Sequence, residues 1–399
     1  MSDQQADFQR YLAPTSPHPI GLEVQRAEGP FIWDTDGKRF TDLVSGIAVN
    51  NLGHRHPEVI RAIQEQSERY LHVMPYGEFV QEPTLELARL LVSLLPDGLD
   101  SCYFVNSGTE SIEAAMKLAK RATGRTRLIA AEGAYHGSTH GALSITDNEK
   151  KKFHARPLLP DVGFIPFGEE SALSAIDSSV AGVIIEPTQG DAGVRIPPKG
   201  YLQAVRNRCD ETGSLLILDE IQTGMGRTGG LFAFLSSGIV PDVLCTAKAL
   251  GAGLPMGAFI ASRDIMELWT HNPMLGHITT FGGHPLCCAA ALAGLRVLTE
   301  QGVLDKVESK GRLFEEGLQH SAIVELRRSG LMMALEFENP DIVQRIVHSA
   351  LDRGIITFWF LSDPQSFRLQ PPLNIEDELI IESCRILREV FDEVCGSSD

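Results

Sequence analysis

The sequence has no long apolar run, no excess of basic residues and no CxxC spacing among its seven cysteines. Without a disulfide framework or a recognisable signal peptide, a reducing cytoplasm is the favoured compartment. A membrane-spanning helix needs about 18 consecutive apolar residues, and no run approaches that length. The formal net charge of −17 argues against nucleic acid and anionic membranes as partners, because both are bound by clustered Lys and Arg.

The composition is that of an ordinary globular protein, with 43% hydrophobic and 22% charged residues. At 399 residues the chain exceeds the size at which one core stops growing, so two domains are expected. The single basic cluster, at 149–152, is interpreted as a solvated loop. Residues 1–20 are polar and hold three prolines, which favours an arm rather than a packed element.

Buried strands alternate with helices through the middle of the chain. Apolar runs predict strands at 102–105, 128–130, 183–185 and 215–218, with helices between them. This spacing predicts βαβ units, an α/β fold and a mostly parallel sheet. The C-terminal hundred residues predict an α+β lobe, joined by a hairpin at 31–46. We therefore expect an N-terminal segment over 1–50 that joins the small domain, a large domain over 51–295 and a small domain over 296–399.

The stretch from Leu215 to Lys248 carries the strongest functional pattern. A buried strand ends in the acids Asp219 and Glu220, and some twenty residues later a second buried strand ends at Lys248. Ligands in open parallel sheets bind beyond the carboxyl ends of the strands. Asp219 and Lys248 should therefore face one crevice, and a structural ion pair at a strand edge is the alternative.

A phosphate site is indicated at the start of the helix that follows the strand at 102–105. Ser107 and Glu110 have the S-x-x-E spacing of a capping box, so Ser107, Gly108 and Thr109 offer hydroxyls and free backbone N–H groups at a helix N-terminus. An ordinary cap without a ligand is the alternative. The P-loop pattern is missing, so a single phosphate monoester fits better than a triphosphate.

Two pairs of histidines invite a metal site. His54 and His56 stand two apart and are interpreted as loop and capping residues. The glycine between His136 and His140 argues against a regular metal-binding helix. No metal is expected.

Four strand ends thus deliver Ser107, Glu186, Asp219 and Lys248 to one edge of the sheet. From WDTDGKRF through RLQPPL the chain resembles the class III (ω-amino acid) aminotransferases, which are pyridoxal-phosphate enzymes of fold type I. It is similar to the acetylornithine, ornithine and 4-aminobutyrate aminotransferases among them. The most specific part is LDEIQTGMGRTGGLFAFLSSGIVPDVLCTAKALGAGLPMGA.

The resemblance implies pyridoxal 5'-phosphate as cofactor and assigns catalytic roles to two residues. Lys248 matches the lysine that forms a Schiff base with the cofactor and, once freed, moves the proton between substrate and cofactor. Asp219 matches the acid that keeps the pyridine nitrogen protonated, so that the ring accepts electrons.

Other positions match the family's cofactor contacts. Gln222 would reach the phenolic oxygen, and Tyr135, followed by His136, would stack on the ring. Ser107, Gly108 and Thr109 would hold the phosphate. Thr280 matches a threonine that the family supplies from the neighbouring subunit, which implies a homodimer with shared active sites.

The substrate contacts come from the same resemblance. Arg368 matches the arginine that binds a substrate carboxylate through two parallel hydrogen bonds. Glu186 matches a residue that pairs with this arginine while an ω-amino substrate is bound and then releases it. The remaining positions expected to face the substrate are Ile47, Tyr76, Ser138 and Thr279.

Two departures bear on the amino donor. Relatives carry an arginine in H-G-R-T that holds a distal carboxylate, whereas this chain has Ser138 there, and burying a carboxylate without its cation costs several kcal/mol. Ile47 stands where ornithine aminotransferases carry a tyrosine, which weakens the ornithine interpretation. Glu78 meets either a cationic donor end or water, and the sequence leaves both open.

The sequence therefore predicts an aminotransferase acting on an ω-amino acid or related amine, with the acetylornithine type favoured. It would use a 2-oxo acid acceptor, 2-oxoglutarate, in a ping-pong mechanism. The alternatives are a 4-aminobutyrate or diamine/lysine transaminase, or an aminomutase or racemase on the same fold. Arg368 favours the transaminase because it gives the keto acid a docking point.

Overall fold

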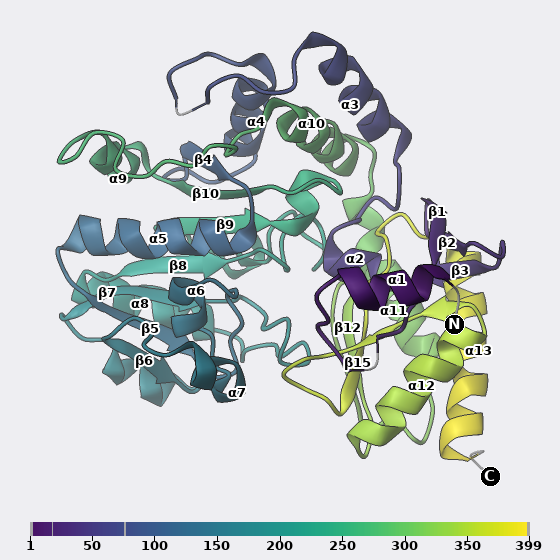
Figure 1. Cartoon of the computed structure of the whole chain (residues 1–399). Coiled ribbons are helices and arrows are strands. Elements are labelled where there is room, and N and C mark those ends of the chain that lie inside the picture. Colours follow the sequence, from purple (N-terminus) through teal and green to yellow (C-terminus); the bar gives the residue numbers. More distant parts are fainter. Residues whose placement is uncertain (1–2, 18, 76, 397–399) are drawn as a thin grey trace.

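A computed structural model describes residues 3–17, 19–75 and 77–396. These residues form a large lobe around a seven-stranded sheet and a smaller lobe that holds two four-stranded sheets (Figure 1). Both ends of the described chain lie on the smaller lobe.

The central sheet is mostly parallel. β10 is antiparallel to β4 and β9, while β9, β8, β7, β5 and β6 run parallel to one another. Every residue of β7, β9 and β10 is buried, which explains their continuous apolar sequences. The predicted α/β fold is confirmed. The strand order is β4 (Ser101–Val105), β10 (Gly257–Ala261), β9 (Val243–Ala247), β8 (Leu215–Asp219), β7 (Val180–Ile185), β5 (Arg127–Ala131) and β6 (Val162–Ile165).

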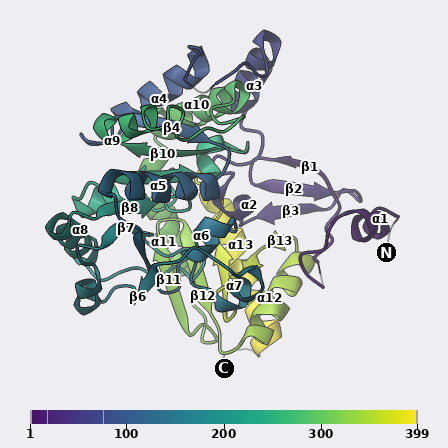
Figure 2. The ribbon, with the colours of Figure 1, turned by 60° about the vertical axis from the view of Figure 1, so that its left-hand side comes forward.

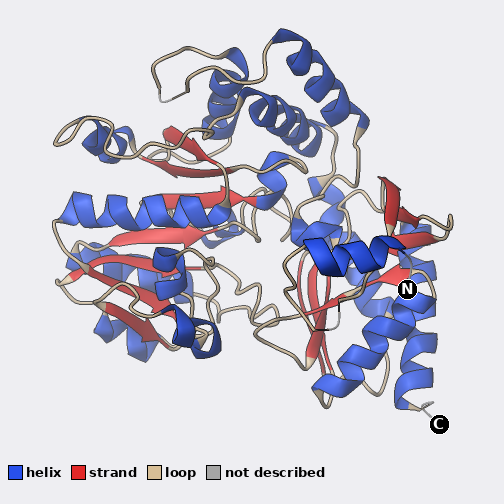
Figure 3. Ribbon diagram, in the orientation of Figure 1, coloured by secondary structure: helices blue, strands red, loops and turns tan. Residues whose placement is uncertain are grey.

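Helices cover both faces of this sheet (Figures 2 and 3). Alternate residues of β8 serve opposite faces, as the two-residue period of a strand requires. Ile217 belongs to the core under α5 (Gly108–Thr123), whereas Leu216 and Leu218 belong to the core that includes α8 (Tyr201–Thr212). β8 is therefore held from both sides.

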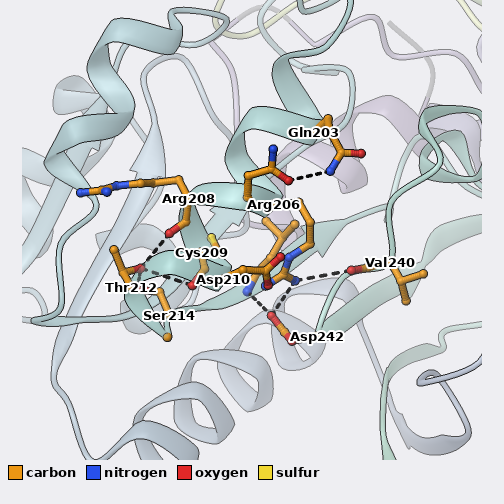
Figure 4. Close-up of polar contacts among 12 residues, drawn as sticks. Gln203, Arg206, Arg208, Cys209, Asp210, Thr212, Ser214, Val240 and Asp242 are labelled. Carbon is orange, nitrogen blue, oxygen red and sulfur yellow. Dashed lines mark hydrogen bonds and ion pairs between the residues drawn. The ribbon is translucent and has the colours of Figure 1, made fainter.

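Polar contacts fix the amino ends of β8 and β9, opposite the candidate site (Figure 4). Asp242 Oδ2, just before β9, accepts hydrogen bonds from Leu216 N at 2.7 Å and from Arg206 Nη1 of α8 at 2.8 Å. Arg206 also pairs with Asp210 one turn further along the helix. The Asp242 carboxylate thus links the amino ends of β8 and β9 to α8.

Three longer helices pack together beside the end of the sheet that carries β4. α3 (Pro57–Arg69) and α4 (Glu82–Ser93) pack against α10 (Pro285–Glu300), so the boundary expected after residue 295 falls inside α10. Within the described ranges no single helix is long and apolar enough to cross a membrane. One bent pair, Pro285–Glu300 with Leu304–Gly317, passes by length and composition alone. Three short helices complete the lobe: α6 (His140–Ser144), α7 (Glu149–Lys152) and α9 (Arg263–Glu267).

The smaller lobe combines both ends of the chain. The predicted hairpin is confirmed, and its strand β3 pairs in parallel with β13, more than 300 residues later. The second sheet is antiparallel and has the order β11-β12-β15-β14. The strands are β1 (Val24–Glu28), β2 (Phe31–Asp34), β3 (Arg39–Asp42), β13 (Ile355–Ile356), β11 (Glu325–Ser329), β12 (Met332–Glu336), β15 (Ser366–Leu369) and β14 (Phe358–Trp359), and the helices are α11 (Val307–Gly317), α12 (Pro340–Asp352) and α13 (Asp377–Cys395).

Two local predictions were wrong. The N-terminal arm contains a helix, α1 (Asp3–Tyr11), because its prolines all lie after residue 13 and good helix formers precede them. The basic cluster is the helix α7 rather than a solvated loop. Its Lys152 is buried with Nζ 4.2 Å from the ring centroid of Phe164, because a lysine stem can pack while its amine stacks on an aromatic face.

Candidate active site

A cavity of about 480 Å³ opens beyond the carboxyl ends of β7, β8 and β9. Glu186 follows β7, Asp219 ends β8 and Lys248 follows β9, so parallel strands deliver all three to one edge. The cavity is lined by most of the residues predicted for the cofactor and donor, namely Ser107, Gly108, Thr109, Tyr135, His136, Ser138, Glu186, Asp219, Gln222 and Lys248.

Asp219 is buried and held on both oxygens. Its Oδ1 accepts a hydrogen bond from Ile221 N at 3.0 Å, and its Oδ2 lies 2.7 Å from His136 Nδ1. Burial alone lowers the pKa of His136, but the hydrogen bond and charge of Asp219, with the charge of Glu186, outweigh it and raise the pKa above its ordinary value. A carboxylate has about four lone-pair sites, so Asp219 retains capacity for a further N–H donor in the cavity.

Lys248 does not pair with Asp219, whose ion-pair partner among the described residues is His136. The alternative of a structural ion pair at the strand edge is thereby excluded. Burial lowers the pKa of Lys248; the carboxylate of Asp219 opposes this shift, and the charge of Arg368 adds to it. A lowered pKa favours the neutral, nucleophilic amine.

The predicted phosphate site, here called the phosphate cup (Ser107, Gly108 and Thr109), lies at the N-terminus of α5. Ser107 Oγ accepts from Glu110 N at 3.3 Å, as the capping box predicts, but the Glu110 carboxylate accepts from Asn106 N at 2.7 Å instead of closing back on Ser107. A Cβ on Gly108 would lie 2.8 Å from the Ile221 side chain, so the close approach here requires glycine. The helix N-terminus and its free N–H groups favour an anion in the cavity.

Two further groups face the expected ring position. Gln222 Nε2 is buried and has no hydrogen-bond partner among the described residues, which leaves a donor available to an oxygen in the cavity. The Tyr135 hydroxyl lies 3.2 Å from Ser138 Oγ, and both residues line the cavity. These positions fit a substituted pyridine ring.

The pairing of Glu186 with Arg368, which is predicted for the donor-bound enzyme, is not formed in this structure. Glu186 accepts hydrogen bonds from Tyr135 N at 3.1 Å and Gly190 N at 2.8 Å, one on each carboxylate oxygen. Arg368 Nη2 instead pairs with Asp191 Oδ1 at 3.2 Å, and both side chains are buried. Burial raises the pKa of Glu186 to about 7, against the opposing effect of His136.

Asp191 is a functional candidate that sequence reasoning missed. Besides Arg368, it accepts from Ser362 Oγ at 2.7 Å and Leu361 N at 3.4 Å, so it ties the loop after β7 to the smaller lobe. It lines the cavity, which gives Arg368 its connection to the site. The available signal was an acid five residues after Glu186 in EPTQGD.

Glu113 of α5 is a second group that was missed. Its Oε1 accepts hydrogen bonds from Thr139 Oγ1 at 2.6 Å, Gly141 N at 2.9 Å and Ala142 N at 3.1 Å. Thr139 Oγ1 is also 2.7 Å from Thr109 Oγ1. The loop that carries Tyr135 and Ser138 is therefore fastened to the helix that forms the phosphate cup.

Ile47 is not among the residues that line the cavity, and Val49 is. The segment Ser45–Ala48 is a left-handed turn, with φ values of 52°, 62°, 64° and 58° in sequence. Asp42 Oδ1 supports the turn by accepting from Val44 N and Ser45 N, each at 2.9 Å. A β-branched residue at positive φ is a strained position that such contacts must hold.

The two threonines predicted at the site lie away from this chain's cavity. Thr280 is exposed, and Thr279 lines a separate surface hollow with Phe79, Val80 and neighbouring residues. Tyr76 lies outside the described residues. Within the described ranges no group of three or more His, Cys, Asp or Glu side chains is placed to hold a metal.

Comparison with known proteins agrees with this geometry. A profile of the family described as Aminotransferase class-III matches residues 11–391. The acetylornithine aminotransferase of Methanopyrus kandleri is 44% identical over 356 residues, which cover 88% of this chain and 90% of the relative. The putrescine aminotransferase of Pectobacterium atrosepticum is 42% identical over 391 residues, which cover 93% and 82%.

Solved structures show the same fold. The ornithine aminotransferase of Toxoplasma gondii superimposes with a TM-score of 0.91 at 29% identity, covering 98% of this chain and 95% of that one. A transaminase from the marine bacterium Virgibacillus gives 0.91 at 25% identity, covering 98% of each chain. Another structure of the Toxoplasma enzyme is described as having partial occupancy of PLP at the active site, with a TM-score of 0.90 at 29% identity. With a cavity suited to that cofactor and a family match over nearly its whole length, this chain belongs to the class III aminotransferases and is a pyridoxal-phosphate-dependent transaminase.

Proposed function

We propose that the enzyme transfers the amino group of an ω-amino acid or related amine, of the acetylornithine type, to 2-oxoglutarate by a ping-pong mechanism. The observation that carries this proposal is the Arg368–Asp191 pair at the wall of the Lys248 cavity. A ping-pong enzyme must receive donor and acceptor in turn at one site. A buried arginine with an internal carboxylate partner suits that requirement, because an incoming carboxylate can replace Asp191.

The chain's own residues divide the work around the cofactor. When bound, pyridoxal phosphate supplies an aldehyde carbon and an electron-accepting ring. Lys248 would hold that carbon and, once released, would move a proton at the substrate carbon. Asp219, which is held by His136, would accept a hydrogen bond from the ring nitrogen and keep it protonated. Gln222 would donate to the ring oxygen, Tyr135 would cover the ring, and the phosphate would be held by Ser107, Gly108 and Thr109.

Asp191 takes the role that the sequence assigned to Glu186. While a donor without a carboxylate at this position is bound, Asp191 neutralises Arg368 and avoids an unpaired buried charge. When 2-oxoglutarate enters, its carboxylate takes over the guanidinium with two parallel hydrogen bonds. Glu186 stays in place and supports the loop of Tyr135 through the backbone N–H of that residue.

The active form in this proposal is a homodimer with shared sites. Thr280 and Thr279 lie outside their own chain's cavity, as residues that serve a partner's phosphate and substrate should. Around them the surface is apolar, with large side chains exposed by 41–89% at Met74, Phe79, Val80, Met274, Leu275 and Phe281. Phe79 and Val80 share one surface hollow with Thr279, and clustered exposed apolar side chains mark protein–protein contacts. A cytoplasmic location is part of the proposal and is supported by seven free cysteines.

A diamine transaminase is the second candidate, and the relative from Pectobacterium atrosepticum favours it at 42% identity. A donor and acceptor panel decides between the two. N-Acetylornithine, ornithine, 4-aminobutyrate, lysine and putrescine are each tested with 2-oxoglutarate and with pyruvate, and the amino acid formed is quantified. We expect N-acetylornithine with 2-oxoglutarate to have the highest kcat/KM. A higher kcat/KM with putrescine would replace the donor assignment, and equal use of pyruvate would remove the acceptor assignment.

A further inference from the structure

The loop 189–195, which follows β7, reaches from the larger lobe to the smaller one. Its two ends pair through backbone hydrogen bonds of 2.9 and 3.1 Å, and Gln189 Nε2 donates to Glu132 O, just after β5, at 2.7 Å. At the tip of the loop, Val194 is buried in an apolar cluster with Phe360 and two residues of β12. The base of the loop therefore belongs to the larger lobe and its tip to the smaller one.

Arg327, on β11, fastens this tip to the segment that leads into β15. Its Nε donates to Gly193 O at 2.6 Å, and its Nη2 donates to Asp363 Oδ2 at 2.9 Å and to Ser366 Oγ at 3.0 Å. A planar guanidinium with several fixed N–H groups can hold both segments at once. A Cβ on Gly193 would collide with the Asp363 carboxylate, so this close approach requires glycine.

Asp191 lies between these two anchored segments. It stands two residues before the Arg327 contact on the loop 189–195, and its Oδ2 accepts from Ser362 Oγ, one residue before the contact on the other segment, at 2.7 Å. Its Oδ1 lies 3.2 Å from Arg368 Nη2. Within the described ranges no hydrogen bond or ion pair joins Asp191 to Arg327 directly. Arg327 can therefore influence Arg368 through the position of Asp191.

We propose that Arg327 is a positioning residue for the carboxylate site: it holds Asp191 against Arg368 and thereby sets how tightly Arg368 binds a substrate carboxylate. The inference rests on the exchange at Arg368 that forms part of the proposed function. Because both segments are already ordered, the Asp191–Arg368 ion pair loses little conformational entropy when it forms. A competing carboxylate is bound more weakly in proportion to the fraction of Arg368 that is free.

Loss of Arg327 should act in the same direction as loss of Asp191. Once the two segments are released, Asp191 occupies Arg368 for a smaller fraction of the time. Arg327→Gln should therefore lower the Kd of a carboxylate ligand, and the KM for 2-oxoglutarate, by about threefold to tenfold. The kcat should change little, because Arg327 does not line the cavity.

The double variant tests whether the effect passes through Asp191. If it does, Arg327→Gln should cause no further change in enzyme that already carries Asp191→Asn, because contacts that act through one another are not additive. A residue with a purely structural role would change carboxylate affinity equally in both backgrounds. Equal changes in the two backgrounds would overturn the proposal.

The neighbouring arginine of β11 provides the matched control. Arg328 is 13% exposed, against 17% for Arg327, and it pairs with Glu308 and Glu315 of α11 instead of the two segments. Arg328→Gln should leave carboxylate affinity unchanged, and a gain equal to that of Arg327→Gln would reject the positioning role. Asp363→Ala removes the same contact from the other side and should reproduce part of the gain, so the test does not depend on the folding of one variant.

A binding measurement separates this inference from the acceptor assignment. Calorimetry of valerate, a carboxylate that has no oxo group to receive an amine, is carried out on holoenzyme of the wild type, both single variants and the double variant, with Arg368→Gln as the blank. Tighter binding to Arg327→Gln that is absent in the Asp191→Asn background supports the positioning role even if 2-oxoglutarate is not used, an outcome that would reject only the acceptor. Equal or weaker binding to Arg327→Gln rejects the positioning role even if 2-oxoglutarate proves to be the acceptor.

Discussion

The cofactor half and the substrate half of the cavity are built in opposite ways. On the cofactor side, Asp219, Lys248 and Ser107 come from the ends of β8, β9 and β4 of one sheet, and Asp219 Oδ2 lies 2.7 Å from His136 Nδ1. On the substrate side, Arg368 belongs to β15 of the smaller lobe, and its partner Asp191 belongs to a loop of the larger one. The first half lies within one lobe, and the second depends on an ion pair between the lobes.

This difference indicates which parts of the enzyme tolerate substitution. The buried strand ends support one cofactor chemistry, because shifting any of them disturbs a packed sheet. At the rim of the cavity, Ser138 is exposed and Lys151 is half-buried, so a single substitution there can change the local charge without disturbing the core. Substrate preference in such a molecule should therefore be adjustable independently of the chemistry.

The strongest test of the comparison removes the reacting amine. Lys248→Ala should lower kcat by at least about 10³-fold, since both covalent binding and proton transfer are lost. Mass spectrometry after borohydride reduction should show cofactor attached to wild type only. Mixed with Thr280→Ala subunits, this variant should regain part of its activity, because one site of the hybrid then has both native residues. Mixtures without any gain in activity would contradict the shared site.

The next test removes the ion pair between Arg368 and Asp191. Arg368→Ala should slow the 2-oxoglutarate half-reaction on the order of 100-fold, because the keto acid loses its paired cation while Asp191 keeps an unpaired buried charge. Single-turnover kinetics of each half-reaction measure this. Asp191→Asn should instead lower KM for 2-oxoglutarate, since Arg368 no longer has to leave a partner. Equal losses in both half-reactions for Arg368→Ala would reject the exchange.

A smaller effect is expected at the rim. Ser138→Arg adds a cation beside Tyr135 and should raise kcat/KM for donors with a distal carboxylate by about tenfold or less. Putrescine should gain nothing, which makes it the control donor. Unchanged kinetics with every donor would show that residue 138 does not contact the substrate.

The smallest effect concerns stability on the cofactor side. Burial raises the pKa of Glu220 from 4.5 to about 7, against its hydrogen bonds with Thr223 and Phe234 N. Because the folded state holds this proton more tightly than the unfolded state, the contribution is fully present below pH 4.5 and is lost as pH rises toward about 7. Glu220→Gln should remove this pH dependence, which amounts to about 1–3 kcal/mol in the free energy of unfolding. The measurement is Tm as a function of pH. Kinetics at one pH should change little, because Glu220 does not line the cavity.

The correct predictions share a physical basis in local sequence. Apolar runs bounded by acids or lysine identified β8 and β9 and the residues at their ends, because burial on both faces leaves a continuous pattern. The cap at Ser107 followed from side-chain spacing within one turn of helix. These features need no knowledge of distant parts of the chain.

The contacts that the sequence did not predict depend on distant partners. In this structure Arg368 pairs with Asp191, and Glu186 accepts a hydrogen bond from the backbone N–H of Tyr135. Ile47 lies in a run of four left-handed residues, which is held by Asp42 and by backbone hydrogen bonds to Val44 O and Ser45 O. The helix at Glu149–Lys152 gains its burial from Phe164 and Tyr135, which lie elsewhere in the sequence.

The sequence by itself determined the cofactor, and it placed Asp219 and Lys248, the predicted ring-nitrogen acid and reacting lysine, at the ends of buried strands, because short apolar runs and the residues that follow them are contiguous in sequence. The tertiary structure alone decided which carboxylate guards Arg368, where Thr280 lies relative to its own cavity, and that Lys151 stands over Tyr135. Those contacts join segments that are far apart along the chain. Their geometry is set by how the lobes and loops pack, which no local pattern of residues records.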